Sequence, residues 1–431
     1  MVAVGLDHRL DLPAIADQGG LRTPALVTVR GWQLLVADPL TTLRSLDQLD
    51  RYAAAVGWRG SRPDGPPFRG GAVGFVSDDL SPGLLSLPPD TRAAVAPLPT
   101  LRFTVHDWCL AVDPEGRGWV VAPRDRLGDL RALARTAGEP EAGRPPRGIA
   151  TAGLDRAAHG AAVSQILEWI AAGDLYQANL TFQIRAAWDG TAADLARALG
   201  GASPGAAHAA LLCNDDGTAI VSVSPETFLR TDGDTVTTRP IKGTRRRHRD
   251  PRDDVAAADQ LRTSVKDHAE HVMIVDLERN DLGRVCVPGS VRVWEYAALE
   301  PHPTVWHLTS TVAGRLRPEV GLADVVRATF PPGSVTGTPK RMAVARTRLL
   351  EPVRRGVYCG AIGMVGPGVL DLSVAIRTAV LSDGVASYGA GGAIVADSDA
   401  GAEYAEALDK AAAFLTATNA VLYQGDMMGR P

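Results

Sequence analysis

The stretch AAHGAAVSQILEWIAAGDLYQANLTFQIRA, residues 157–186, indicates the fold class because two hydrophobic periods follow one another in it. Residues 157–174 carry apolar side chains at helical spacing, and residues 176–186 alternate apolar and polar side chains as a strand does. Helix and strand patterns then alternate up to a long helix at about residues 399–419. This mixture favours a layered α+β or α/β fold.

The region ahead of this stretch has a different pattern. Residues 1–130 show short strands and turns, as in residues 101–123, where a Pro-Glu-Gly-Arg-Gly turn splits two apolar runs. Residues 131–153 are rich in proline, glycine and charge, which is typical of an exposed connection. We therefore predict an N-terminal region at 1–130, a connection at 131–153 and a main domain at 154–422. A chain of 431 residues can form one elaborated domain or two packed lobes.

Composition excludes several classes of function. A net charge of −4 and a pI of about 6.2 argue against nucleic acid as a partner. The sequence has no apolar run of about 18 residues to span a membrane, and its first residues lack a signal-peptide pattern. The four cysteines are isolated, which excludes a Cys-x-x-Cys zinc site and argues against a disulfide framework. We expect a soluble, cytoplasmic protein.

Lysine is rare in this chain. Of 45 basic residues only four are lysines, namely Lys242, Lys266, Lys340 and Lys410. Arginine serves wherever a permanent positive charge is enough, whereas a lysine amine can lose its proton and act as a nucleophile. Each lysine is therefore a candidate for chemistry, although four lysines can also remain by chance.

Two helical stretches offer acidic side chains on one face. Glu403, Glu406 and Lys410 are spaced three and four apart near the C-terminus, and Asp267 and Glu270 are three apart in residues 265–283. Two helices that each present carboxylates can hold one Mg²⁺ ion, which prefers a few carboxylate oxygens together with water and substrate oxygens. The alternative is that both faces are solvated and carry ordinary intrahelical ion pairs.

Two glycine-rich segments offer backbone N–H groups. In FPPGSVTGTPKRMA, residues 330–343, we expect a polar loop followed by a helix with Thr338 as its N-cap, an arrangement that suits an anion. The alternative is a tight loop–helix joint without a function. In YGAGGAIVADS, residues 388–398, we expect a glycine-rich turn whose N–H groups meet a carboxylate, or else a simple hairpin turn.

SPETFLRTDGDTVTTRPIKGTRRR, residues 224–247, is expected to form a hairpin with its turn at about residues 231–234. Glu226 precedes the first strand and Lys242 lies at the end of the second, so an antiparallel hairpin brings the two together. A carboxyl group beside an amine in a pocket is a plausible acid and nucleophile pair. A surface ion pair is the alternative.

These segments together resemble the chorismate-utilising enzymes, which include anthranilate synthase component I, aminodeoxychorismate synthase component I, and isochorismate and salicylate synthases. The resemblance covers about residues 155–422 and is weaker at residues 68–75. It implies an α+β fold, a layered β-sheet sandwich with flanking helices that binds chorismate. The ordered motifs are GDLYQANLT, SPETFL, TRPIKGT, AEHVMIVDLERNDLGRV, VWHLTSTVAG, FPPGSVTGTPK, RRGVYCGAIG, LSVAIRTAV and AGGAIVADSDAGAEYAEALDKA.

The resemblance assigns a metal and an acid. Glu270 and Glu406 match the Mg²⁺ ligands of the family, with Glu403 and Asp267 in support, and Mg²⁺ is the cofactor it implies. Glu226 matches the general acid that assists departure of the 4-hydroxyl of chorismate.

The resemblance also assigns residues that hold chorismate. Tyr358 and Arg377 match residues for the enolpyruvyl carboxylate, and His307 and Ser334 match positions beside the ring and its carboxylate. Ala393 stands where many relatives have glycine, so a positive φ there would strain the backbone. The remaining expected binding residues are Gln177, Thr244, Gly391, Gly392 and Lys410.

Two positions separate the branches of the family. Water-using members resemble one another in having a lysine at the position of Gln177, and glutamine cannot serve as a base. Anthranilate synthases typically have alanine at the position of Lys242, which lets ammonia attack C2. In aminodeoxychorismate synthases the matching lysine resembles a covalent catalyst that directs nitrogen to C4. The resemblance thus implies chorismate amination at C4, for 4-aminobenzoate and folate or for secondary metabolism.

The ammonia source and two rival functions complete the expectations. None of the four cysteines has the setting of a glutaminase nucleophile, so we expect a separate glutamine amidotransferase subunit to supply ammonia. An anthranilate synthase component I is the first alternative, although the segment QLLVADP lacks the glutamate and serine of the tryptophan-feedback signature. An inactive homologue that binds chorismate or regulates is the second alternative.

Overall fold

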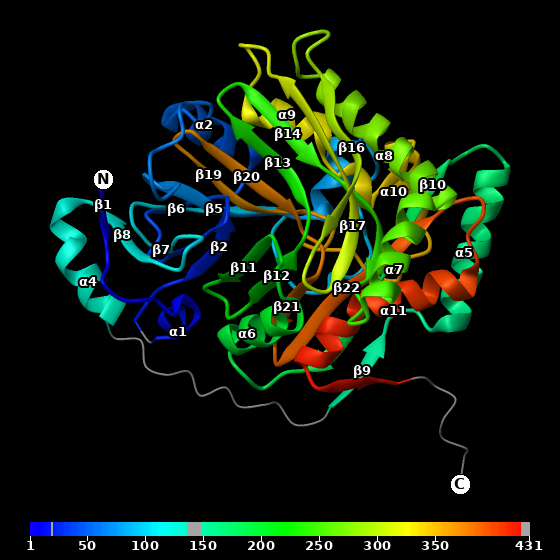
Figure 1. The fold of residues 1–431 in the computed structure, drawn as a ribbon, viewed down its shortest axis with the longest axis horizontal. Helices are drawn as coiled ribbons and strands as arrows, with labels where there is room; N and C mark the ends of the chain where they lie inside the picture. The colour runs from blue at the N-terminus through cyan, green and yellow to red at the C-terminus, as the bar shows by residue number, and fades with distance from the viewer. Residues whose placement is uncertain (19, 136–147, 424–431) are drawn as a thin grey trace.

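The computed structural model describes residues 1–18, 20–135 and 148–423, and its ribbon is drawn in Figure 1. Two large β-sheets pack against each other, and helices cover their outer faces (Figure 1). The predicted layered α+β sandwich is therefore confirmed.

The first sheet has thirteen strands among the described residues, in the order β1-β8-β7-β3-β2-β11-β12-β21-β22-β10-β9-β23, with β18 beside β10. Neighbours pair antiparallel except β9 and β23, which run parallel. The strands are β1 Val2–Gly5, β2 Ala25–Val29, β3 Trp32–Val36, β7 Cys109–Val112, β8 Gly118–Ala122, β9 Gly148–Ala152, β10 Gln177–Ala187, β11 His208–Cys213, β12 Ala219–Ser224, β18 Gly337–Thr338, β21 Thr378–Ser382, β22 Val385–Ile394 and β23 Ala420–Leu422.

The second sheet has ten described strands, in the order β15-β17-β14-β13-β20-β19-β5-β6-β4, with β16 beside β17. The strands are β4 Thr41–Leu43, β5 Gly71–Val76, β6 Leu101–His106, β13 Thr227–Asp232, β14 Thr235–Arg239, β15 Ile241–Arg246, β16 Arg292–Pro301, β17 Val305–Arg315, β19 Ala361–Gly366 and β20 Val369–Val374.

Eleven α-helices and three short 3₁₀ turns lie among the described residues. They are α1 Leu12–Ala16, α2 Leu46–Val56, α3 Ser81–Leu84, α4 Leu127–Arg135, α5 Arg156–Ala171, α6 Ala192–Ala202, α7 Pro251–Thr263, α8 Val265–Gly283, α9 Leu322–Thr329, α10 Lys340–Thr347, α11 Ala400–Ala417, η1 Asp78–Leu80, η2 Arg124–Arg126 and η3 Gly333–Val335.

The stretch at residues 157–186 forms the predicted helix and strand, α5 and β10. Asp155 caps α5 by accepting a hydrogen bond from Ala158 N–H, and Val163 and Ile166 bury the apolar side of the helix. The predicted C-terminal helix is α11, which Asp399 caps in the same way. Local side-chain chemistry thus sets both helix starts.

The core has three main layers. Side chains from both sheets, among them Val27, Val73, Ile362 and Val380, pack between the sheets. Helices α6 and α11 bury their apolar faces on the first sheet, and α2, α8 and α9 pack on the second. Figure 1 shows α6 and α11 on one side of the molecule and α8 and α9 on the other.

Strands from the first part of the chain enter both sheets. Strand β2 pairs with β11, and β5 pairs with β19, so residues 1–130 share both sheets with residues 154–422. Within the predicted connection at 131–153, α4 ends at Arg135 and β9 begins at Gly148; residues 136–147 lie outside the described residues. The proposed domain boundaries remain predictions.

Among the described residues, no helix combines the length and the apolar composition that a membrane crossing requires.

Candidate active site

Lys242 lies in β15, just beyond the predicted hairpin. Strands β13 and β14 pair antiparallel as expected, with Thr227 opposite Arg239, and Glu226 directly precedes β13. Pro240 then separates β14 from β15, so Lys242 belongs to the next strand rather than to the hairpin itself. Its Nζ is 3.8 Å from Glu270 Oε2.

The surroundings of Lys242 favour a neutral amine. Its side chain is 12% exposed. Burial lowers the pKa of Lys242, Glu270 opposes this shift, and the nearby positive charge of Lys410 adds to it. This is the direction that a lysine nucleophile requires at neutral pH.

Glu226 is a buried carboxyl group close to Lys242. Burial raises its pKa to about 7, while the neighbouring Ser334 hydroxyl, the Lys242 amine and the Ile241 N–H oppose the rise. A carboxyl group with this pKa keeps its proton over part of the neutral range and can donate it. The predicted acid and nucleophile are therefore brought together inside the protein, and the alternative of a surface ion pair is wrong.

Helices α8 and α11 bring three of the four predicted carboxylates near Lys242. Lys266 Nζ lies 3.0 Å from Glu403 Oε1 and 4.0 Å from Glu270 Oε1, so it bridges the two helices. Lys410 Nζ lies 2.7 Å from Glu406 Oε1. The expected faces of the two helices meet instead of being solvated separately.

The charges of this group act on one another. Burial raises the pKa of Glu270, Lys242 and Lys266 oppose the rise, and the negative charges of Glu403 and Glu406 add to it. Lys410 lowers the pKa of Glu406. Mutual repulsion between carboxylates from two helices is a property of sites that bind a cation.

Asp267 does not join this group. It lies in the first turn of α8, and its carboxylate forms an ion pair with Arg245 Nη2 at 2.7 Å. This contact directs the carboxylate to Arg245, and the support of a metal ion by Asp267 stays a prediction.

The donor chemistry of Glu270, Glu403 and Glu406 fits a hard divalent cation. Mg²⁺ needs only a few carboxylate oxygens, because water and substrate oxygens complete its shell. Within the described part of the chain, however, no three His, Cys, Asp or Glu side chains gather closely enough to hold a metal alone. Lys266 instead supplies the positive charge between Glu270 and Glu403.

Gly391 and Gly392 lie within strand β22, so the predicted turn at residues 388–398 is wrong. Gly391 pairs with Thr181, and a Cβ on Gly391 would lie 2.3 Å from Leu180 O. The chain stays extended here. Because glycine has no side chain, the backbone of β22 can approach β10 closely. Ala393 pairs with Asn179 and has no positive φ, so alanine fits there without strain.

The backbone of β22 borders the carboxylates. A Cβ on Gly392 would lie 3.5 Å from Glu403 Oε2, 3.6 Å from Lys410 Nζ and 3.9 Å from Glu406 Oε1. Lys410 Nζ also donates a hydrogen bond to Gly391 O at 3.0 Å. Glycine thus keeps the space beside the charged groups open, as the prediction of a backbone binding site requires.

Arg377 and His307 lie near the same region. Arg377 has a positive φ of 52°, and its Nη1 donates to Lys410 O at 2.7 Å. His307 lies in β17, opposite Thr244 of β15. Burial lowers the pKa of His307 to about 3, and His302 and Arg377 add to the shift, so this imidazole is neutral. Thr244 is exposed and brings its backbone beside His307.

Tyr358 packs against Gly389 of β22. A Cβ on Gly389 would lie 2.2 Å from the ring carbon Cγ of Tyr358, so only glycine leaves room for this ring. Tyr358 and Gly389 also line a small cavity together with Gln183. The sequence pattern predicted a turn at Gly389. The residue instead lies in β22, where the absence of a side chain leaves room for the Tyr358 ring.

Gln177 and Ser334 present buried polar atoms without a protein partner among the described residues. Neither amide atom of Gln177 is hydrogen-bonded, and the Ser334 hydroxyl approaches Glu226 without completing a hydrogen bond. Gln177 pairs with Thr338, so Gln177 borders the loop at residues 330–343 that carries Ser334. Buried polar groups without a partner favour an interior that receives a polar ligand.

The loop at residues 330–343 ends differently from the prediction. Thr338 belongs to strand β18, and Pro339 is the N-cap of α10 without a side-chain hydrogen bond. Thr338 as the N-cap is therefore wrong, because pairing with β10 keeps this residue extended.

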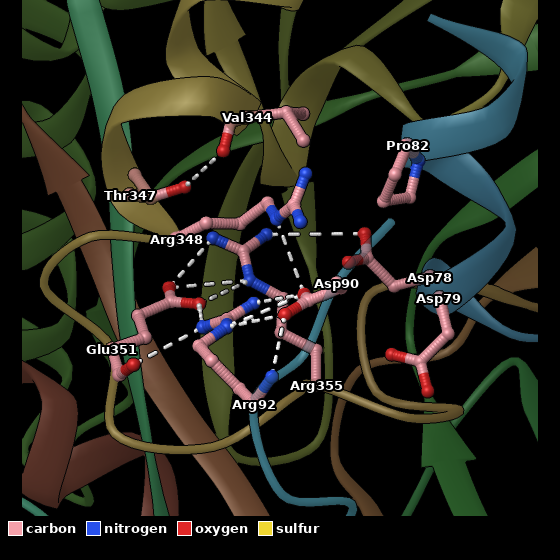
Figure 2. A pocket seen from close by; sticks show the side chains of 10 residues that line it. All are labelled: Asp78, Asp79, Pro82, Asp90, Arg92, Val344, Thr347, Arg348, Glu351 and Arg355. Atoms are coloured by element: carbon pink, nitrogen blue, oxygen red, sulfur yellow. Dashed lines mark hydrogen bonds and ion pairs between the residues drawn. The ribbon is translucent and has the colours of Figure 1, made fainter. Parts of the chain in front are cut away.

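The sequence patterns did not indicate Glu351 and Arg355. Arg355 holds the backbone at two positions next to the site. Arg355 donates from Nη2 to Asn179 O at 2.7 Å and from Nη1 to Val335 O at 3.1 Å. Its ion pair with Glu351 measures 2.8 Å. Figure 2 shows Arg355 and Glu351 together with Arg92, whose Nη1 lies 3.4 Å from Glu351 Oε2. The only sequence signal was the i, i+4 spacing of glutamate and arginine.

Comparison with known proteins agrees with this geometry. Residues 19–416 match the family described as chorismate binding enzyme. The chain is 38% identical to aminodeoxychorismate synthase component 1 of Salmonella typhimurium, over 88% of this chain and 88% of that protein. It is 38% identical to anthranilate synthase component 1 of Streptomyces coelicolor, over 88% of this chain and 77% of that protein.

Solved structures show the same fold. Anthranilate synthase component I from Streptococcus pneumoniae superposes with a TM-score of 0.78 at 29% identity, covering 89% of this chain and 92% of that one. The menaquinone-specific isochorismate synthase MenF from Escherichia coli has a TM-score of 0.78 at 17% identity, covering 97% and 94%. This chain belongs to the chorismate binding enzyme family, and it is a chorismate-utilising enzyme.

Proposed function

We propose that this protein is the chorismate-aminating subunit of an aminodeoxychorismate synthase, an enzyme that transfers an amino group to C4 of chorismate. The observation that carries the proposal is Lys242, a buried lysine with a lowered pKa beside the protonatable Glu226. The relative from Escherichia coli named aminodeoxychorismate synthase component 1 is 38% identical over 86% of this chain.

Sequence identity alone does not choose between the two amination products. The Streptomyces coelicolor relative named anthranilate synthase component 1 is also 38% identical. The choice rests on Lys242, because two successive displacements return nitrogen to C4, whereas one displacement leaves it at C2.

In the first displacement the Lys242 nitrogen forms a bond to C2 as the bond between C4 and its hydroxyl oxygen breaks. Glu226 gives its proton to the departing hydroxyl, which leaves as water. The attacking amine must be neutral and the acid must be protonated, and burial shifts both pKa values accordingly.

In the second displacement ammonia forms a bond to C4 as the bond between C2 and the Lys242 nitrogen breaks. The electron pair of that bond returns to the lysine nitrogen. The Lys242 nitrogen carries one positive charge in the adduct and leaves as a neutral amine, while the new C4 ammonium gives one proton to the Glu226 carboxylate, so charge and atoms balance over the cycle.

Glu270, Glu403 and Glu406 would hold a Mg²⁺ ion that supplies positive charge at the ring carboxylate. The carboxylates repel one another, and three lysines now balance them. We propose that Glu270 and Glu406 are the principal ligands. Asp267 is left out because Arg245 neutralises it.

The remaining residues position chorismate. Arg377 and Tyr358 would receive the enolpyruvyl carboxylate, and the Arg377 guanidinium is aimed by its hydrogen bond to Lys410 O. Neutral His307 can donate one hydrogen bond to the ring carboxylate. Gln177 and Ser334 offer their unpartnered polar atoms to the ring substituents.

Ammonia would come from a separate glutamine amidotransferase subunit. The relatives are named component 1, which implies a second component. All four cysteines of this chain are free and at least partly buried, and burial raises the pKa of Cys109, Cys213, Cys286 and Cys359. Such thiols do not suit a glutaminase nucleophile.

Product identification tests the proposal. The purified chain is incubated with chorismate, Mg²⁺ and an ammonium salt, and products are separated by chromatography with mass detection. We expect aminodeoxychorismate, which a lyase converts to 4-aminobenzoate. Fluorescent anthranilate formed without a second enzyme would assign the anthranilate synthase reaction instead, and no consumption of chorismate would indicate an inactive binding homologue.

A further inference from the structure

Glu278 is a buried carboxyl group that the proposed mechanism leaves unused. It lies on α8, where its side chain points into the core with Val275 and Leu282. It is 2% exposed. A buried carboxyl group is costly unless its polar atoms have a role or a partner.

One oxygen of Glu278 holds the loop that carries Ser334. The Gly333 N–H donates to Glu278 Oε1 at 3.1 Å in a buried setting. A Cβ on Gly333 would lie 2.9 Å from that same oxygen and 2.9 Å from Leu277 Cδ2, so the loop backbone sits tightly on α8. The other oxygen, Oε2, has no hydrogen-bond partner among the described residues.

Two buried carboxyl groups therefore meet consecutive residues of one loop. Glu278 binds the backbone of Gly333, and Glu226 lies beside the hydroxyl of Ser334. One peptide bond joins Gly333 to Ser334, so the hydrogen bond from Glu278 lies directly next to the residue beside Glu226.

The surroundings keep Glu278 neutral. Burial and the nearby charge of Asp281 raise its pKa to about 8, and Lys340 only partly opposes the rise. Lys340 is engaged elsewhere, because its Nζ lies 2.6 Å from Asp281 Oδ2 and donates to Thr329 O at 2.8 Å. A neutral carboxyl group still offers a carbonyl oxygen to an N–H donor.

We propose that Glu278 is a positioning residue that sets the Ser334 hydroxyl against Glu226 by accepting the hydrogen bond of the Gly333 N–H. This inference rests on the proposed function, because it assigns Glu226 the role of the acid. It adds a residue outside the substrate contacts to that function.

The test compares two variants of Glu278. Glu278→Gln keeps an acceptor of the same shape, and Glu278→Met keeps the length without an acceptor. We expect kcat for chorismate amination within about twofold of the parent in the Gln variant and a loss of about tenfold in the Met variant, from one lost buried hydrogen bond. KM for chorismate should change little in the Gln variant and should rise in the Met variant to the extent that Ser334 contacts the substrate. Asp276→Ala, on the exposed face of the same helix, is the matched control.

The pH profile separates positioning from a general loss of stability. Ser334 lowers the pKa of Glu226, so Glu278→Met should move the alkaline limb of kcat/KM to higher pH. Ser334→Ala should move it in the same direction, and the double variant should move it no further. Additive shifts, an unmoved limb in Glu278→Met, or a Gln variant as impaired as the Met variant would each overturn the proposal.

A spectroscopic measurement covers the case in which Glu278→Met does not fold. The infrared difference spectrum of the parent and Glu278→Gln should show a carboxylic acid carbonyl band at neutral pH, and a carboxylate band there would contradict a neutral Glu278. This readout needs no turnover. A parent enzyme that fails to aminate chorismate would refute the proposed function, whereas the band reports on Glu278 alone.

Discussion

Two groups of oppositely charged side chains differ in their basic residues, which are lysines in a partly exposed group and arginines in a mostly buried one. The lysine cluster consists of Lys242, Lys266 and Lys410 with Glu270, Glu403 and Glu406. The arginine cluster consists of Arg92 and Arg355 with Asp90 and Glu351 and is drawn in Figure 2. The first lies between α8, α11 and β22, and the second lies behind strand β10.

The pKa shifts of Lys242 and Arg355 run in opposite directions. Burial outweighs Glu270 and lowers the pKa of Lys242, which prepares it to lose a proton. Burial also opposes the charge of Arg355, but Glu351, Cys359 and Asp78 together outweigh this effect and raise the pKa well above its usual value. The guanidinium of Arg355 further binds two backbone carbonyls, so its charge is permanent and its donors are used.

The four lysines of this arginine-rich chain share one kind of position. Each lysine pairs with an acidic side chain at or next to the candidate site: Lys242 with Glu270, Lys266 with Glu403, Lys340 with Asp281 and Lys410 with Glu406.

The largest effect is expected at Lys242. Lys242→Ala should lower amination at C4 by at least about a thousandfold or divert nitrogen to C2. Lys242→Arg should be equally inactive, because a guanidinium keeps its proton. Products from chorismate and ammonium would be quantified by chromatography. A Lys242→Arg variant that forms aminodeoxychorismate at the parental rate would show that no neutral amine is needed.

The next effect concerns Glu270 and the metal. Glu270→Ala should lower turnover on the order of a hundredfold and weaken Mg²⁺ binding, because a principal carboxylate ligand is lost. Calorimetric titration of Mg²⁺ into each protein gives the affinity without turnover. Asp267→Ala is the matched control on the same helix, and we expect it to bind Mg²⁺ nearly as the parent does. Equal losses of Mg²⁺ affinity in both variants would contradict the assignment of Glu270, and not Asp267, as a ligand.

The arginine cluster should respond in stability rather than in chemistry. Arg355→Lys keeps the charge but cannot reach Glu351, Asn179 O and Val335 O together, so the free energy of unfolding should fall by about 2 to 3 kcal/mol. Denaturant titration measures the loss. Unchanged stability together with a lost C4 product would mean that Arg355 belongs to the chemistry.

The smallest effect is a pH dependence that sets Glu226 apart. Its pKa is raised to about 7, and a general acid works only while protonated. The loss of the Glu226 proton should therefore lower kcat/KM on the alkaline side, and protonation of Lys242, whose pKa is lowered by burial, should lower it on the acidic side. Glu226→Gln should lose the alkaline limb, because glutamine does not titrate. A pH profile that is the same in the parent and in Glu226→Gln would exclude Glu226 as the acid.

The sequence by itself determined which elements form and which residue types gather. Helix periodicity and the caps Asp155 and Asp399 are local, so α5 and α11 were predictable. The hairpin of β13 and β14 was predictable because its turn and its strands are close in the chain. The ordered motifs gave the family.

Only the tertiary structure decided how these residues meet. The predicted turn at Gly391 is a strand, because pairing with β10 across about 200 residues outweighs the local preference of glycine for turns. Asp267 stays outside the group of Glu270, Glu403 and Glu406, and it pairs instead with Arg245 of strand β15. Glu278 gains its place from Gly333, which is 55 residues away. Lys242 was visible in the sequence as a rare lysine, but its lowered pKa depends on burial and on charges from distant helices, which no local pattern encodes.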